Sequence, residues 1–185
     1  SFLVDNSRKL KDRGISANDF CFIIHNYIHS RSAAFCLAYP DNPRVYVDSI
    51  WGLADGLLFY AHDSFELHPD RPHTLKKQIR FKSNYLAPDA QGKWIPRNTG
   101  RPWDWKPSVS EDELASIGKY TQKLATHLGK CVQVMWFVGI PAGSGSSPLL
   151  PWWYETEETP KHPQAADPRV FRRDRVTVST WEDLT

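Results

Sequence analysis

The sequence predicts an α+β fold in which one long helix packs on a mostly antiparallel sheet. In the first half of the chain, short stretches of alternating apolar and polar residues are joined by turn residues, which is typical of hairpins. Near residue 110, a helix-capping pattern opens a segment with an apolar stripe at helical spacing. The uncharged stretch 131–138 follows that segment directly, as expected for a buried strand.

The composition indicates one ordinary globular domain. The chain has 185 residues, enough for one core and too few for two comfortable ones, so we interpret 1–185 as a single domain. Residue 1 is Ser and the single methionine is Met135, so we expect a fragment of a larger protein. The net charge of +2 gives no support for nucleic-acid binding, and no apolar run approaches the roughly 20 residues of a membrane span. Three widely spaced cysteines favour a reducing compartment, and hence the cytoplasm.

The N-terminal part predicts a helix followed by strands. A short helix is expected over 7–14. Residues 20–29 alternate and predict a strand, and two further strands are expected at 33–39 and 44–50, joined by a Pro-Asp-Asn-Pro turn. The spacing favours antiparallel hairpins.

The middle of the chain predicts two further strands. After a polar loop at 68–73, residues 76–86 alternate again, and we expect a strand that carries Gln78, Arg80 and Lys82 on one face. A short strand is expected at 92–97, followed by a loop that reaches the start of the helix.

The helix is predicted from Ser110 to Leu128. Ser110 is an N-cap residue, Glu113 completes a capping box, and Gly129 is placed to end the helix. In the strand 131–138, Gln133, Met135 and Phe137 share one face, and Val132, Val134, Trp136 and Val138 share the other. Beyond it, we expect a flexible 141–148 segment and a last strand near 171–178.

Several polar and aromatic clusters have both a functional and a structural interpretation. His25 and His29 are about 13 Å apart along a strand, too far for one metal ion, which favours ordinary sheet histidines. The glycine-serine segment 143–147 could hold phosphate, but it lacks the lysine and helix of a phosphate loop. Arg80 and Lys82 could contact phosphates or be solvated. Two tryptophan clusters could stack on sugars or bases, or anchor loops: Trp103, Trp105, Trp152 and Trp153.

The order of these elements resembles the second half of the nucleotide-binding domain of phosphoenolpyruvate synthase and pyruvate phosphate dikinase. The resemblance covers about residues 20–138. His25 stands at a glutamine position of the family, "AAF" with Pro40 matches a "SGVxFTxxP" hairpin, and Asp48 occupies the position of an acidic residue in a strand. "GLAD" (52–55) replaces "GLGE" and "HDSF" (62–65) replaces "PDxY". The segment 109–136 follows the family's "LSDEEL" helix and "DIEW" strand.

The resemblance implies an ATP-grasp-like core at 20–140, with 141–185 as a divergent extension. It implies that the domain binds ATP with Mg²⁺ and belongs to a phosphotransferase. By position, Asp48 and Asp55 would lie on the acidic side of the nucleotide pocket, and His25 near the base. Arg80 and Lys82 would contact phosphates, while Gln133 occupies a metal-ligand position.

The departures from the family concern that metal position. The family's Asp-x-Glu-Trp carboxylates serve Mg²⁺ and the phosphates, and here Gln133 and Met135 replace them. An amide is a weak ligand for Mg²⁺, and a thioether has no useful affinity for a hard cation. Whether Glu155 or Glu157 folds back to compensate is open. The family's closing "LQxRP" segment has no counterpart after residue 140.

The expected function is therefore ATP binding without turnover by this chain alone. Its partners would be a nucleotide and the remaining domains of a larger polypeptide. The alternative is a degenerate, non-catalytic module on the same scaffold that binds another ligand or a protein partner through its tryptophans.

Overall fold

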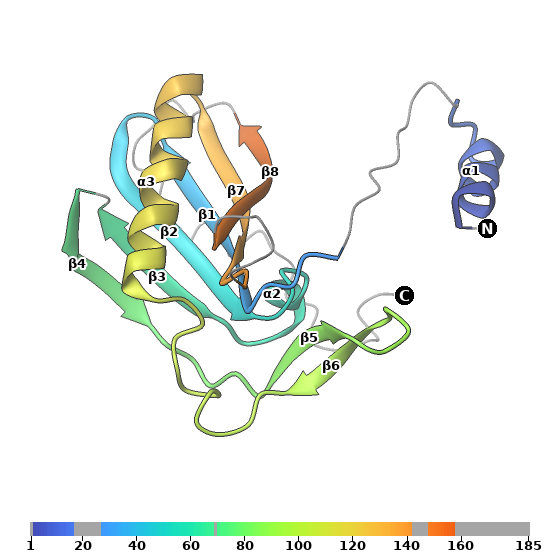
Figure 1. Ribbon diagram of the computed structural model, residues 1–185. Coiled ribbons are helices and arrows are strands. Elements are labelled where there is room, and N and C mark those ends of the chain that lie inside the picture. Colours follow the sequence, from blue (N-terminus) through green and yellow to red (C-terminus); the bar gives the residue numbers. More distant parts are fainter. Residues whose placement is uncertain (1, 17–26, 69, 142–147, 158–185) are drawn as a thin grey trace, which may run out of the picture.

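The computed structural model describes residues 2–16, 27–68, 70–141 and 148–157, and confirms a mixed α+β fold (Figure 1). The helices are α1 (Phe2–Asp12), α2 (Gly56–Phe59) and α3 (Glu111–Leu128). The strands are β1 (Ser32–Tyr39), β2 (Asn42–Trp51), β3 (Asp63–His68), β4 (Arg71–Gln78), β5 (Asn84–Pro88), β6 (Trp94–Asn98), β7 (Cys131–Val138) and β8 (Leu149–Glu157). Six of the strands form one sheet in the order β4-β3-β2-β1-β7-β8, and β5 pairs with β6 separately. Neighbouring strands are antiparallel throughout both sheets.

The long helix α3 lies along one face of the six-stranded sheet (Figure 1). Its buried residues Leu114, Ile117 and Ala125 join one apolar cluster with side chains from β1, β2, β3 and β7. Burying a side chain of the size of Leu114 or Ile117 stabilises the fold by about 1.5–3 kcal/mol. The predicted helix is confirmed at both ends: the Ser110–Glu113 capping box is present, and Gly129 closes the helix in the left-handed conformation, with φ 63°.

The capping glutamate also ties the helix to the start of β1. Glu113 Oε2 accepts from the Ser110 N–H at 2.8 Å and from Arg31 Nη2 at 2.6 Å. Burial would raise the pKa of the Glu113 carboxyl, but these hydrogen bonds and the Arg31 charge outweigh it, so the pKa is lowered. The carboxylate therefore stays ionised where the helix begins.

The predicted faces of 131–138 are also confirmed. Val132, Val134, Trp136 and Val138 belong to the cluster under α3, while Met135 and Phe137 belong to a second cluster on the opposite face. The predicted hairpin is present as β1 and β2 joined at Pro40-Asp41. Short strand β6 appears where 92–97 was expected, and the first helix, α1, begins earlier than the expected 7–14.

Three sequence predictions are wrong. The expected strand 76–86 ends at Gln78, because residues 79–83 leave the sheet and Lys82 turns inward to a buried partner. The loop expected at 68–73 is shorter, since β4 already begins at Arg71. Residues 149–157, not predicted as a strand, form β8 against β7.

Other predictions are only partly covered by the described residues. Of the expected strand 20–29, residues 27–29 are irregular and the rest lies outside the described ranges. The 143–147 segment and the expected last strand at 171–178 also lie outside them. None of the described helices combines the length and the apolar character that a bilayer crossing requires.

Candidate functional site

The candidate site is the face of the six-stranded sheet that lies opposite α3. On this face the strand register aligns two rows of side chains across β3, β2, β1, β7 and β8. One row is Ser64, Asp48, Phe35, Met135 and Trp153. The other is Glu66, Tyr46, Leu37, Gln133 and Glu155. We call these ten residues the open face, because no described helix covers them. It has an apolar middle between two polar ends.

At the β2–β3 end of the open face, Asp48 lies beside a histidine. His62 Nε2 is 3.8 Å from Asp48 Oδ1, and His62 Nδ1 is 3.1 Å from the Tyr60 carbonyl oxygen. Because a carbonyl only accepts, Nδ1 carries a proton, and Nε2 is the nitrogen that faces the carboxylate. Two cations at this end are already engaged, because Arg44 and Lys76 both form ion pairs with Glu66.

At the opposite end, β8 brings new groups to the open face. Gln133 lies directly across from Glu155, and Met135 lies across from Trp153. The rings of Trp153 and Phe35 are in contact, with centroids 5.5 Å apart. Glu155 is thus the acid that folds back beside Gln133. Sequence reasoning raised this possibility, but only the register of β8 places the carboxylate on the face.

The predicted site residues are only partly brought together. Asp48 and Gln133 share the open face, with Cα atoms roughly 12 Å apart by strand spacing. Asp55 is an exposed residue in the turn before α2. Arg80 follows the end of β4, where its guanidinium donates to Gln78 Oε1 at 3.1 Å. His25 lies outside the described residues.

Lys82 lies in the interior, away from the open face. Its Nζ donates to Asp63 Oδ1 at 2.7 Å and to the Arg80 carbonyl at 2.9 Å, and both ion-pair side chains are 0% exposed. Asp63 Oδ2 accepts from the N–H and the hydroxyl of Ser108. In this conformation the Lys82 ammonium joins the segment after β4 to Asp63 at the start of β3, and Asp63 in turn holds the segment before α3 through Ser108. The ammonium does not reach a surface ligand.

The metal position of the resembling family is not reproduced. Mg²⁺ prefers an octahedron of oxygen ligands, commonly one or two carboxylates with phosphates and water. Gln133 and Glu155 supply one amide and one carboxylate, while Met135 has no carboxylate partner across from it. Within the described ranges, no group of three or more His, Cys, Asp or Glu residues could hold a metal ion. These residues do not fit a protein-held Mg²⁺.

The other tryptophan cluster forms packing contacts at the loop before α3. Trp51 meets Trp103 edge to face at 5.6 Å and donates its indole N–H to the Trp103 carbonyl at 3.0 Å. Lys106 Nζ lies 4.5 Å from the centre of the Trp103 ring. Trp105 contacts Phe81, and both remain about half exposed, at 62% and 48%. This cluster anchors a loop and leaves the side chains of Phe81, Trp103 and Trp105 partly at the surface.

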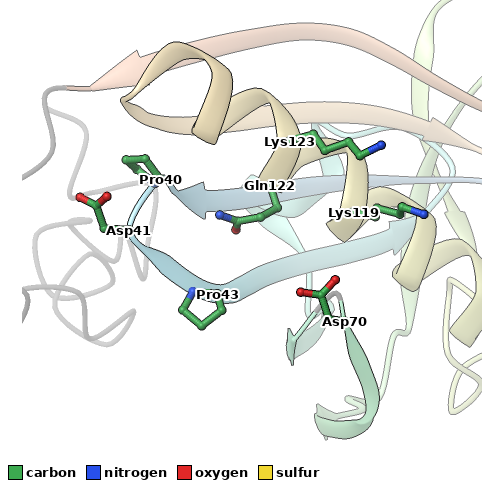
Figure 2. Close-up of a pocket in the computed structure, with 7 residues that line it drawn as sticks. All are labelled: Pro40, Asp41, Pro43, Asp70, Lys119, Gln122 and Lys123. Carbon is green, nitrogen blue, oxygen red and sulfur yellow. The ribbon is translucent and has the colours of Figure 1, made fainter.

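A separate hollow of about 360 Å³ lies between α3 and the two hairpin turns (Figure 2). Figure 2 shows Lys119, Gln122 and Lys123 on the helix, and Asp41 and Asp70 on the turns. Gln122 Nε2 donates to the Tyr39 carbonyl at 2.8 Å. Neither the predicted site residues nor the open face contributes to this hollow, whose charges are of both signs.

Comparison with known proteins finds a distant similarity to a bacterial enzyme. No protein-family profile matches the chain. Over 100 residues, the chain is 26% identical to the prodigiosin synthesizing transferase PigC of Serratia marcescens. That match covers 53% of this chain and 11% of PigC, so the chain corresponds to a small part of the relative's length.

Proposed function

We propose that the open face binds the nucleotide ATP, and that the domain is ATP-grasp-like and related to the nucleotide-binding domain of phosphoenolpyruvate synthase. One observation carries the proposal: Asp48 and Gln133, distant in sequence and both assigned to the nucleotide pocket by the resemblance, occupy the same sheet face. The larger buried apolar cluster lies on the other face, under α3, and neither Asp48 nor Gln133 belongs to an apolar cluster on either face.

The chain alone is expected to bind ATP without turning it over. Phosphoryl transfer depends on electrostatic stabilisation of the phosphates by metal ions and cations. Met135 supplies no carboxylate, and the Lys82 ammonium is buried against Asp63. The short match to PigC, a protein named a transferase, supports a role as one part of a larger transferase. Asp55, Arg80 and His25 remain proposed contacts of the nucleotide.

Calorimetric titration of ATP into the chain tests the proposal. We expect binding that Asp48→Asn weakens by about 10- to 150-fold, because a hydrogen bond to a charged acceptor contributes about 1.5–3 kcal/mol. The matched control is Asp41→Asn, on the exposed β1–β2 turn. Titrations with AMP and with Mg²⁺ show whether the triphosphate and the metal contribute. Absence of ATP binding, or an equal effect of both variants, would contradict the proposed site.

A second candidate function is a protein-interaction module, favoured by the half-exposed pair Phe81 and Trp105. Exposed aromatic side chains are frequent anchors of protein interfaces. In this case Trp105→Ala would abolish partner binding and leave ATP titrations unchanged. Asp48→Asn would leave partner binding intact.

A further inference from the structure

Resting on the proposed function, we propose that the β7–β8 end of the open face receives the planar base of the ligand and not its phosphates. The residues that carry the inference are Trp153, Phe35, Gln133 and Glu155. The ligand class is a purine with an exocyclic amino group. The nucleotide would then lie with its base where the resembling family has its metal carboxylates.

An aromatic surface lies at the β7–β8 end of the open face. Trp153 lies across from Met135, and its ring contacts Phe35 at 5.5 Å with an interplanar angle of 58°. The Trp153 side chain is still 37% exposed, so part of the indole surface remains open to a ligand. A base stacked on such a ring is typically bound several-fold to a hundred-fold more tightly than without it. Met135 is buried beneath this surface and belongs to the apolar cluster that supports it.

Hydrogen-bonding groups lie beside that aromatic surface. Gln133 and Glu155 are cross-strand neighbours, two residues along the strands from Met135 and Trp153, so they border the aromatic floor on the same face. An ionised glutamate only accepts hydrogen bonds, while a glutamine amide both donates and accepts. Together they match an exocyclic amino group next to a ring nitrogen, as in adenine.

The charge at the β7–β8 end disfavours phosphate binding there. Phosphates need cations or a metal, and this end presents an exposed carboxylate, Glu155, for which the described structure shows no cationic partner. Carboxylate and phosphate repel each other, so the phosphates are expected to point away from β8. Toward the opposite edge of the sheet lies Arg80, whose guanidinium donates to Gln78 Oε1 and carries further donors.

The experiment compares ligands that separate the base from the phosphates. Adenosine, inosine and ATP, the last with and without Mg²⁺, are titrated into the 185-residue chain. Variants Trp153→Ala and Glu155→Gln test the base site. The control is Trp94→Ala, which removes a half-exposed tryptophan of the β5–β6 hairpin, away from the open face. Circular dichroism and thermal unfolding verify that each variant is folded.

We expect adenosine itself to bind, with Trp153→Ala weakening it by about 5- to 100-fold and Trp94→Ala leaving it unchanged. Adenosine is expected to bind about tenfold more tightly than inosine, because inosine presents an acceptor to Glu155. Glu155→Gln should reduce this preference to near unity, since the amide introduced at this position can donate to the oxygen of inosine.

Two other outcomes would overturn the inference. In the first, ATP binds only with Mg²⁺, adenosine does not bind, and Glu155→Gln abolishes the effect of the metal. This end of the open face would then hold metal and phosphates, so the inference fails while the proposed ATP function survives. If neither adenosine nor ATP binds, the inference and the proposed function both fail.

Discussion

Replacing Asp63 tests whether Lys82 is a structural residue or a ligand contact. Both side chains are fully buried and their charged atoms are 2.7 Å apart. Asp63→Asn keeps the shape of the side chain and removes its charge, so the Lys82 ammonium loses its counter-ion in the interior. Removing one partner of a buried pair costs about 3–5 kcal/mol.

The hydrogen bonds of Asp63 place the expected cost in the upper part of that range. Oδ1 accepts from Lys82 Nζ and from the Arg80 N–H, while Oδ2 accepts from the N–H and hydroxyl of Ser108. An asparagine has only one oxygen, so its amide NH₂ must face one of these two donor pairs. We expect Asp63→Asn to lower the free energy of unfolding by about 4–5 kcal/mol.

The assay is urea denaturation followed by tryptophan fluorescence and circular dichroism, for Asp63→Asn, Lys82→Met and the double variant. The double variant should be destabilised by at least about 1 kcal/mol less than the sum of the single variants, because no lone charge is left inside. A cost below about 1 kcal/mol for Asp63→Asn, or strict additivity, would refute the reasoning. If Lys82→Met abolished ATP binding at unchanged stability, Lys82 would be a ligand contact after all.

Three further predictions concern stability. Gly52→Ala should lower the free energy of unfolding by about 3 kcal/mol, measured by thermal unfolding, because φ is +70° and the added Cβ would collide with the Leu86 carbonyl oxygen. Gly92→Ala, at φ +77° with open space around it, should lower it by only about 1 kcal/mol. The pKa of Glu113 is lowered, so its stabilising contribution should be lost as pH falls below 4.5, a loss absent in Glu113→Gln; equal acid sensitivity would contradict this. Burial raises the pKa of Cys36 to about 12, so stability should fall by about 1.4 kcal/mol per pH unit above pH 9, relative to Cys36→Ala. A matching pH profile for Cys36→Ala would disprove that last prediction.

Elements with local signals could be predicted from the sequence. The capping box, apolar stripe and closing glycine of α3 lie within about 20 residues of one another, and each contributes without help from the rest of the fold. The β1–β2 hairpin and the two faces of β7 follow from turn residues and strand alternation in the same way.

The remaining elements depend on distant contacts. The alternation of 76–86 predicts a strand, but Lys82 pairs with Asp63, 19 residues earlier, and this partner cannot be read from local spacing. Strand β8 contains Pro151 and adjacent aromatic residues, which obscure its alternation, and a register shift near Met135 changes which residues share a face. The proximity of Glu155 to Gln133 follows from that register alone.

The order of strands in the sheet has one consequence for how the molecule could be divided. β1 to β4 form one consecutive meander, β7 and β8 form another, and the two meet along a single seam, where Ser32 to Ala38 pair with Val138 to Val132. A chain cut in the exposed loop around Lys106 would give two fragments that can reassemble through this seam and α3. Asp48 belongs to one fragment and Glu155 to the other, so a ligand that contacts both would favour reassembly. The two halves would then serve as a split reporter of their own ligand.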